Sequence, residues 1–241
     1  GNELWRTDGT TAGTVFVKEI RPGTNGSNPS EFCQAGTLMY FKANDGTIGD
    51  ELYFANGVPE GQPGHSFGLA ADLFPGGTWD SGTPQYITYA GKGKIVFSAK
   101  DGIVLGGWGG TQAVPHLLGG AGTSYAPISH FELIGGVTTP VPTYSPSNMQ
   151  YHNGRVYMSA SDGNYSATTY DVYNTDGSVS FKLTDMAWQQ EVGILHFDDA
   201  NQLVYIAGYY RDALGANAPT DTNFGRQLWV VDVSAGWTTA N

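Results

Sequence analysis

The fold of this chain is decided by Gly36-Thr37-Leu38-Met39-Tyr40-Phe41-Lys42-Ala43-Asn44-Asp45-Gly46, which runs into Asp50-Glu51-Leu52-Tyr53. Aromatic and aliphatic residues fill a run that is too short for a helix and typical of a β-strand. The Asp-Gly pair that follows favours a turn, because Gly adopts positive φ at low cost and Asp bonds the nearby backbone. The stretch therefore predicts two strands joined by a tight turn.

The same pattern returns three times further along the chain, which indicates an internal repeat. Its later copies begin with the strands 93–102, 154–163 and 202–208, and the first two of these end in Asp-Gly. A fourth strand is predicted after each aromatic strand, at 15–20, 68–73, 113–118 and 179–183. Pro115 predicts an edge position for its strand, because Pro has no N–H to donate. The aromatic residue of the third strand falls at Trp5, Tyr53, Trp108, Tyr170 and Trp229, with spacings of 48, 55, 62 and 59 residues.

Repeats of three to four strands and about 50 residues are typical of a β-propeller. We therefore predict an all-β, β-propeller-like fold of about four to five blades, each with three to four antiparallel strands. A single repeat domain would cover 1–241, with units at about 1–29, 30–75, 85–118, 147–186 and 191–241. Trp5 and Trp229 hold the same place in the pattern, so one third strand is surplus. This favours a piece of a longer chain or pairing of the surplus strand with another subunit.

Composition excludes several classes of protein. The formal net charge of −11 and the absence of a basic patch argue against nucleic acid as a partner. No apolar run approaches the roughly 20 residues that span a bilayer as a helix. Cys33 is the only cysteine, so no intrachain disulfide forms, and a buried thiol is the expected role.

The first copy of the repeat, Glu3-Leu4-Trp5-Arg6-Thr7-Asp8-Gly9-Thr10, resembles the ELWxxDGT repeat family. The resemblance continues through Ser27-Asn28-Pro29 to Asp50-Glu51-Leu52-Tyr53, and the later copies lose the Glu-Leu-Trp and Asp-Gly-Thr residues. The family's repeats stand in tandem in large secreted or surface-associated microbial proteins and are thought to form propeller blades. The resemblance thus implies an extracellular or cell-surface location. It brings no catalytic residues with it.

Two kinds of candidate site arise from the residues themselves. Asn44, Asp45, Asp50 and Glu51 gather the oxygen ligands that Ca²⁺ prefers, although plain turn chemistry explains the same residues. Calcium is the one cofactor that the sequence suggests. Trp79, Trp188, Tyr209 and Tyr210 are candidates for stacking on sugar rings, and packing between blades is the alternative. Asn25 and Asn164 begin N-glycosylation sequons.

The function that the sequence favours is a non-enzymatic structural or interaction module of a secreted or cell-surface assembly. Other protein subunits are the expected partners, including further copies of this chain. A carbohydrate-binding propeller is the alternative. A polysaccharide-active enzyme is a second alternative, because its two carboxylates, for which Asp171 and Asp198 are candidates, pair in space rather than in sequence. The stretches 119–147 and 211–225 read as long loops, where a recognition surface would be sought.

Overall fold

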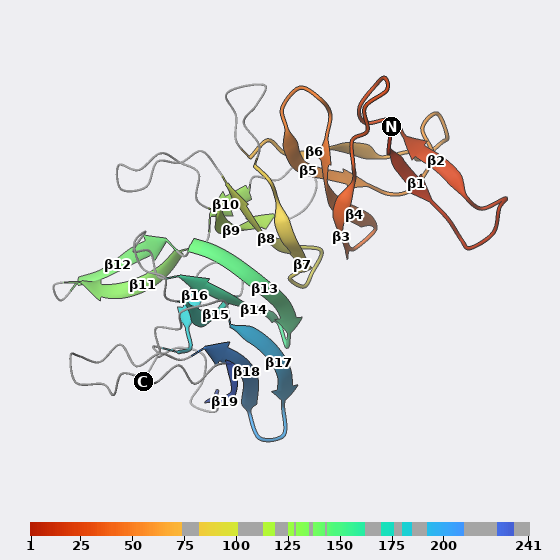
Figure 1. Ribbon diagram of the computed structural model, residues 1–241. Helices are drawn as coiled ribbons and strands as arrows, with labels where there is room; N and C mark the ends of the chain where they lie inside the picture. Colours follow the sequence, from red (N-terminus) through yellow and green to blue (C-terminus); the bar gives the residue numbers. More distant parts are fainter. Residues whose placement is uncertain are drawn as a thin grey trace. The chain divides into compact units, whose positions relative to one another are not determined.

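The described residues of a computed structural model form strands and turns and contain no helix, as the sequence predicted (Figure 1). They are residues 1–73, 82–100, 113–118, 125–127, 129–134, 137–142, 144–161, 170–175, 180–184, 192–209 and 226–233. They include no helix that is long and apolar enough to cross a membrane. The chain divides into two compact units, Gly1–Ala126 and Pro127–Asn241, where the sequence suggested one repeat domain.

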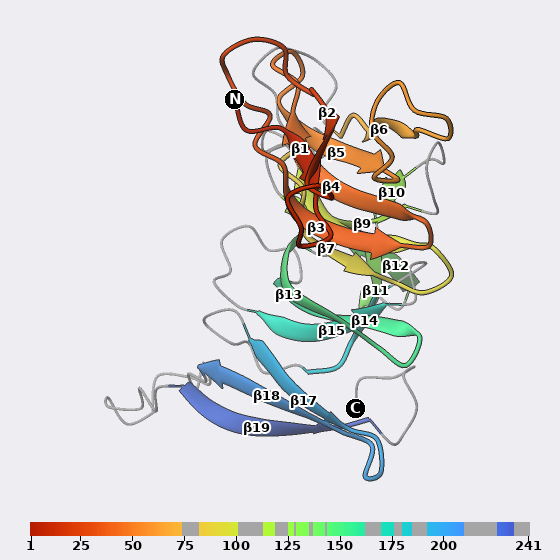
Figure 2. The same ribbon diagram turned by 90° about the vertical axis from the view of Figure 1, so that its right-hand side faces the viewer.

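The first unit is built from three small sheets (Figure 2). A two-stranded sheet pairs β1 (Leu4–Arg6) with β2 (Val15–Lys18). A four-stranded antiparallel meander follows, formed by β3 (Ser30–Ala35), β4 (Leu38–Asn44), β5 (Asp50–Ala55) and β6 (Phe67–Ala71). The third sheet has the order β7 (Gln85–Tyr89), β8 (Ile95–Lys100), β9 (Ala113–Leu118) and β10 (Tyr125–Pro127). Each sheet thus follows the order of the chain.

The second unit is built from two sheets, one of six strands and one of three. A meander of β13 (Tyr144–His152), β14 (Arg155–Ser161), β15 (Asp171–Thr175) and β16 (Ser180–Lys182) is extended at β16 by a hairpin of β11 (Ser129–Ile134) and β12 (Val137–Pro142). β11 lies parallel to β16. The last sheet contains β17 (Gly193–Asp198), β18 (Leu203–Tyr209) and β19 (Arg226–Asp232).

The four strands β3, β7, β13 and β17, each of which begins a meander, carry a β-bulge. The register shifts between Ser30 and Cys33, between Gln85 and Thr88, between Ser147 and Gln150, and between Ile194 and His196. In three of these bulges the residue after the first has positive φ: Glu31 (58°), Tyr86 (53°) and Asn148 (51°). A bulge increases the local twist of a strand. The sheets are therefore structural repeats even where their sequences have diverged.

Successive sheets within a unit pack face to face, because alternate residues of each strand point to opposite faces. Tyr40 and Leu52 pack against Ile95 and Phe97 of the next sheet. Phe41 and Tyr53, one residue further along, pack on the other face, against Leu4 and Val17 of β1 and β2. In the second unit Tyr157 and Val172 pack against Val204 and Ile206. Two-sided burial explains why these strands are nearly continuous runs of apolar residues.

Two predictions about individual segments are wrong. The strand 113–118 is β9, which pairs with β8 on one side and has β10 on the other. Pro115 therefore lies opposite Ser98 in an interior strand. Its strand, β9, is the third of its sheet rather than an edge strand. The stretch 119–147, expected to be a loop, contains β11 and β12. Its Thr and Val residues, which suit a strand, outweighed the Pro residues around them.

Candidate functional site

The glutamate of the Glu-Leu-Trp motif holds the backbone where the chain leaves one sheet for the next. Glu3 Oε2 accepts hydrogen bonds from Ile20 N (2.8 Å) and Ser27 Oγ (2.6 Å), and its Oε1 accepts one from Ser27 N (3.1 Å). Glu51 does the same one repeat later, from Leu73 N (2.7 Å) to Oε2 and from Gly82 N (2.8 Å) to Oε1. We call these two arrangements the glutamate clamps.

The backbone around the clamps repeats as closely as the side chains. Asn28 N donates to Asn2 O at 3.2 Å, and Thr83 N donates to Asp50 O at 2.9 Å. Asn28 and Thr83 both have positive φ, 47° and 42°. Burial alone would raise the pKa of Glu3, but the bonds from Ser27, Ile20 and Arg21 outweigh it and lower the pKa. Glu51 has no exposed surface, and its burial raises the pKa to about 7 despite the bonds from Gly82 and Leu73.

In the second unit an aspartate takes the place of the glutamate. Asp171 lies opposite Ala160 just as Glu51 lies opposite Ala43. Its Oδ1 accepts a hydrogen bond from Thr184 Oγ1 (2.8 Å), and its Oδ2 lies 3.1 Å from Lys182 Nζ. Aspartate is shorter than glutamate by one methylene group, and Asp171 contacts the segment after β16 through the Thr184 side chain. Asp171 was a candidate for a catalytic carboxylate pair. In the structure its two oxygens bind Thr184 and Lys182 instead.

The four residues of the calcium prediction are divided by the structure. Asn44, Asp45 and Asp50 meet at the β4–β5 turn, where Asn44 Nδ2 donates to Asp50 Oδ1 (3.0 Å) and Asp45 Oδ1 accepts from Thr47 N (2.8 Å). Arg21 Nη1 lies 3.5 Å from Asn44 Oδ1, so a guanidinium already supplies positive charge there. Glu51 turns away into its clamp. Among the described residues no group of three or more His, Cys, Asp or Glu side chains is arranged to hold a metal. Calcium binding stays a prediction.

Most of the predicted aromatic and glycosylation residues fall outside the described part of the chain. Trp79, Trp188, Tyr210 and Asn164 lie there, and so does the side chain of Tyr209, the last residue of β18. Asn25 is exposed in a loop, whereas the hydroxyl of Ser27 in the same sequon is bonded to Glu3 inside the clamp. Cys33 is half-buried, and burial raises the pKa of its thiol.

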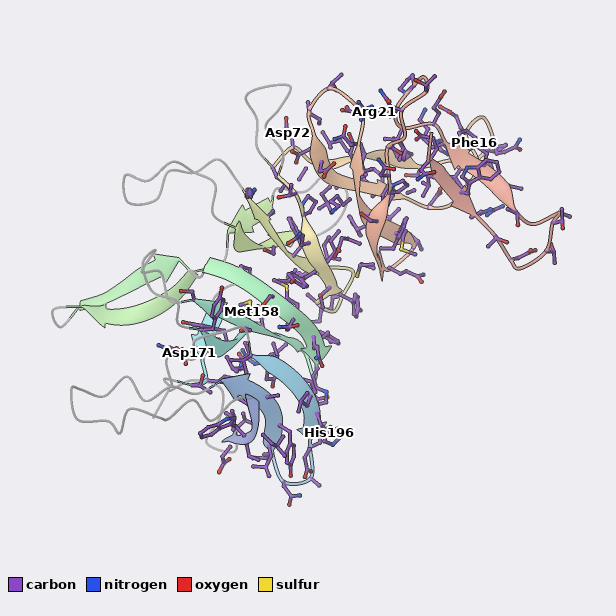
Figure 3. All side chains as sticks on the ribbon, viewed as in Figure 1. Phe16, Arg21, Asp72, Met158, Asp171 and His196 are labelled. Atoms are coloured by element: carbon purple, nitrogen blue, oxygen red, sulfur yellow. The ribbon has the colours of Figure 1, made fainter. Side chains whose placement is uncertain are left out.

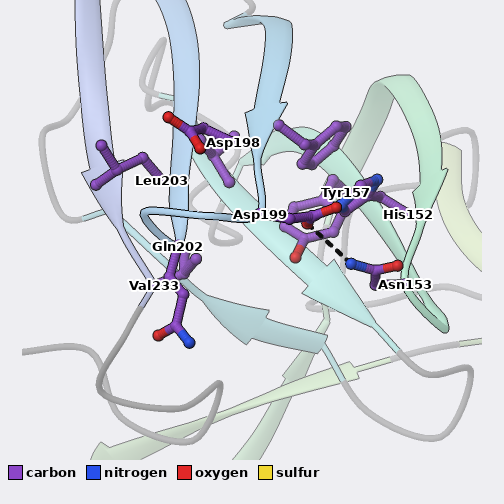
Figure 4. Close-up of a pocket in the computed structure, with 10 residues that line it drawn as sticks. His152, Asn153, Tyr157, Asp198, Asp199, Gln202, Leu203 and Val233 are labelled. Atoms are coloured by element: carbon purple, nitrogen blue, oxygen red, sulfur yellow. Dashed lines mark hydrogen bonds and ion pairs between the residues drawn. The ribbon is translucent and has the colours of Figure 1, made fainter.

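A pocket that the sequence did not predict opens in the second unit (Figure 4). It lies where the β13–β14 turn meets the β17–β18 turn and has a volume of about 320 Å³. His152 Nε2 lies 2.7 Å from Asp199 Oδ1, and Asn153 Nδ2 donates to the same oxygen at 2.9 Å. Two turns that lie 47 residues apart in sequence are thus held together by one carboxylate.

The wall of this pocket is aromatic and its floor is aliphatic. The Phe197 ring stacks on the His152 imidazole, with centroids 4.1 Å apart and planes 5° apart. Tyr157 packs edge-on against Phe197 at 4.7 Å. Leu203, Val204 and Val233 add the apolar floor, while Asp198, Asp199, Asn153 and Gln202 form a polar rim. Asp198 also stabilises its own turn, because it accepts hydrogen bonds from the backbone and the side chain of Asn201. The same bonds lower the pKa of Asp198.

Large aromatic side chains are exposed on the first sheet and on the adjoining strand β3. Trp5 and Phe16 are cross-strand partners of β1 and β2, with rings in edge contact at 5.3 Å, and Phe16 is labelled in Figure 3. Trp5 keeps 57% of its surface exposed and Phe32 keeps 51%. A groove of about 690 Å³ runs between them beside β1, which within the described residues pairs with β2 alone. We call Trp5, Phe16 and Phe32 the N-terminal surface.

The last sheet also has an apolar outer face. Trp229 and Val231 of β19 pack into the core, and Leu228 and Val230 alternate with them toward solvent. Leu228 is 65% exposed and Val230 is 50% exposed, and Leu195 of β17 is exposed as well. We call Leu195, Leu228 and Val230 the C-terminal surface. Comparison of the chain with family models, with curated proteins and with solved structures finds no match.

Proposed function

We propose that this chain is a non-enzymatic structural module that self-associates, with its sheets arranged as the blades of a β-propeller-like array. Three observations support the blade arrangement: meanders of up to four strands, a bulge in the strand that begins each meander (β3, β7, β13 and β17), and face-to-face packing of successive sheets. The first strands of successive sheets also lie side by side, β3 with β7 and β13 with β17. Strands that approach in this way suit a radial arrangement.

The observation that carries self-association is the pair of exposed apolar faces, one on the first sheet and one on the last. Sheets between them in the described chain bury such faces against a neighbour, as Phe41 and Tyr53 do. The N-terminal surface exposes Trp5 and Phe16 instead, and the C-terminal surface exposes Leu228 and Val230. Exposed apolar patches of this kind mark association sites. A second copy of this chain is the partner that offers the complementary face.

Pairing of these two different surfaces is heterologous, so it joins copies head to tail into rings or filaments. An extracellular or cell-surface setting is part of the proposal, supported by the resemblance of residues 3–57 to repeats of secreted proteins. The structural use of the carboxylates supports a non-enzymatic role: Glu3 and Glu51 hold backbone, and Asp198 holds its own turn.

Sedimentation velocity of the full chain over a range of concentrations tests self-association. We expect assembly to be abolished by the double substitution Trp5→Ser and Phe16→Ser, and separately by Leu228→Ser and Val230→Ser. The change Leu69→Ser is the matched control, because Leu69 is also exposed but lies on β6. A wild-type chain that remains a monomer at every concentration, or assembly that the control disrupts equally, would overturn the proposal.

Mixing the two double variants gives a sharper test. Each variant keeps one intact surface, so together they should form a dimer that cannot grow, while each alone stays monomeric. An isologous interface, in which one surface pairs with itself, would instead leave one variant able to dimerise alone. Electron microscopy of the wild-type assembly would then show whether the blades close into rings or continue as filaments.

A further inference from the structure

The pocket between the β13–β14 and β17–β18 turns is not a product of the repeat. His152 is the last residue of its strand and pairs with Arg155 across a two-residue turn. Ala35 stands at the same place in the first unit, pairs with Leu38 in the same way, and is buried in the core. An alanine therefore satisfies the packing of the fold here, and the imidazole of His152 is an addition that the fold does not require.

The polar groups around the pocket are arranged so that one carboxylate oxygen remains available. Asp199 Oδ1 accepts from both His152 and Asn153, whereas Oδ2 receives no hydrogen bond from the described residues. Asp198 is engaged on both oxygens by Asn201. The side-chain amides of Asn153 and Gln202 stand on the same rim and offer both donors and acceptors.

This set of groups discriminates between classes of ligand. Two carboxylates repel an anion, and no group of three metal-ligating side chains is present in the described residues. An ammonium ion would use only the acceptors of the rim, whereas a hydroxyl group both donates and accepts. The apolar floor of Leu203, Val204 and Val233 matches the C–H face of a sugar ring or polyol. A volume of about 320 Å³ lies at the low end of the roughly 300–1,000 Å³ of small-molecule sites.

We propose that this pocket binds a neutral ligand with adjacent hydroxyl groups, of the size of one sugar ring. Two neighbouring hydroxyls reach the rim, one donating to Asp199 Oδ2 and the other exchanging hydrogen bonds with the Asn153 or Gln202 amide. The ring lies over Leu203 and Val233. His152 is a positioning residue, because it holds Asp199 in place and is itself held by Phe197.

The site is independent of the proposed self-association, because it shares no residue with the N-terminal or C-terminal surface. A free sugar and the terminal residue of a glycan offer the same hydroxyl chemistry. Probes of both kinds therefore belong in the test: methyl glycosides of glucose, galactose, mannose and N-acetylglucosamine, and immobilised glycans that end in the same sugars.

Binding of these methyl glycosides to the full chain is measured by saturation-transfer NMR and titration calorimetry. We expect at least one to bind with a dissociation constant of about 1 mM or tighter. Asp199→Asn should weaken that binding by about tenfold or more, because it turns the free acceptor into a donor while an amide oxygen still accepts from His152. The control Asp45→Asn makes the same change at the β4–β5 turn of the other unit and should leave affinity unchanged.

Three results would overturn the proposal. The first is no binding of any probe, free or immobilised. The second is equal binding by the wild type and the Asp199→Asn variant. The third is tighter binding of glucosamine than of methyl glucoside, since that would show recognition of positive charge. His152→Ala, which restores the alanine of the first unit, should abolish binding, and an unchanged melting temperature would show that the variant remains folded.

Discussion

Glu3 and Glu51 occupy the same position of the repeat, yet their pKa values move in opposite directions. Glu3 directly precedes β1 and is partly exposed, so its hydrogen bonds dominate its pKa. Glu51 is enclosed between two sheets, and the loss of water outweighs two bonds from backbone N–H groups. Below pH 7 and above the ordinary pKa of a glutamate, a carboxylate and a carboxylic acid therefore fill equivalent places in one molecule.

Glu51 should make stability depend on pH. Its folded pKa of about 7 lies above its ordinary value of 4.5, so the stabilisation it gives is complete below pH 4.5 and is lost as pH rises through 7. The free energy of unfolding of the wild type, measured relative to Glu51→Gln, should fall by at most about 3 kcal/mol over this range. Chemical denaturation from pH 4 to 8 measures it. A difference that stays constant, or grows with pH, would contradict the prediction.

Gly82 is a second residue whose identity follows from the clamp. A Cβ atom at this position would lie 2.4 Å from Leu73 Cβ and 2.8 Å from Glu51 Oε2. We expect Gly82→Ala to lower the free energy of unfolding by about 1–3 kcal/mol, the usual cost of overpacking. Thermal unfolding followed by circular dichroism would measure the loss. No detectable loss would mean that the clamp shifts without strain to admit a methyl group.

At the scale of the element, backbone strain recurs at β3 and β7, the strands that begin the two four-stranded sheets. Positive φ is found at Asn28 and Thr83, just before β3 and β7, and again at Glu31 and Tyr86 inside their bulges. Asn tolerates this region because its short side chain bonds locally, whereas a β-branched residue such as Thr does not. The repeated geometry has thus been kept by the fold in spite of unsuitable residues.

Thr83→Asn should accordingly stabilise the protein. The substitution places the residue of the equivalent position, Asn28, at a φ of 42° and should raise the free energy of unfolding by about 1 kcal/mol. Thr37→Asn is the control, because Thr37 is exposed and not at positive φ, and it should change stability by less than about 0.5 kcal/mol. A loss of stability on Thr83→Asn would show that the Thr side chain contributes more than its backbone costs.

The strands were largely predictable from sequence: apolar runs followed by Asp-Gly predicted β4, β8 and β14, and an apolar run alone predicted β18, each to within about two residues of its observed bounds. The clamps were not, because Glu3 and Glu51 bond to backbone 17 to 31 residues away and no local pattern records that reach. The pocket was missed for the same reason. Its one signal in the sequence is His152 at the place of Ala35, which only an alignment of the turns brings out.

At the scale of the whole molecule, the formal net charge of −11 opposes association of copies. If apolar surfaces join them, salt should strengthen the assembly by screening this repulsion. Sedimentation coefficients measured between low and high ionic strength should therefore rise for the wild type and stay constant for the Trp5→Ser, Phe16→Ser variant. Dissociation of the wild-type assembly by salt would indicate that ion pairs, rather than apolar contact, hold it together.

The glutamate clamps also bear on how such a chain is made. Glu3 closes on a backbone group 24 residues later, and Glu51 on one 31 residues later. On the ribosome, each of these two clamps can close only when the backbone group that its glutamate binds has left the exit tunnel. In the first unit, each newly made repeat then stabilises the one before it. A lost glutamate would therefore delay the maturation of its neighbour rather than only its own.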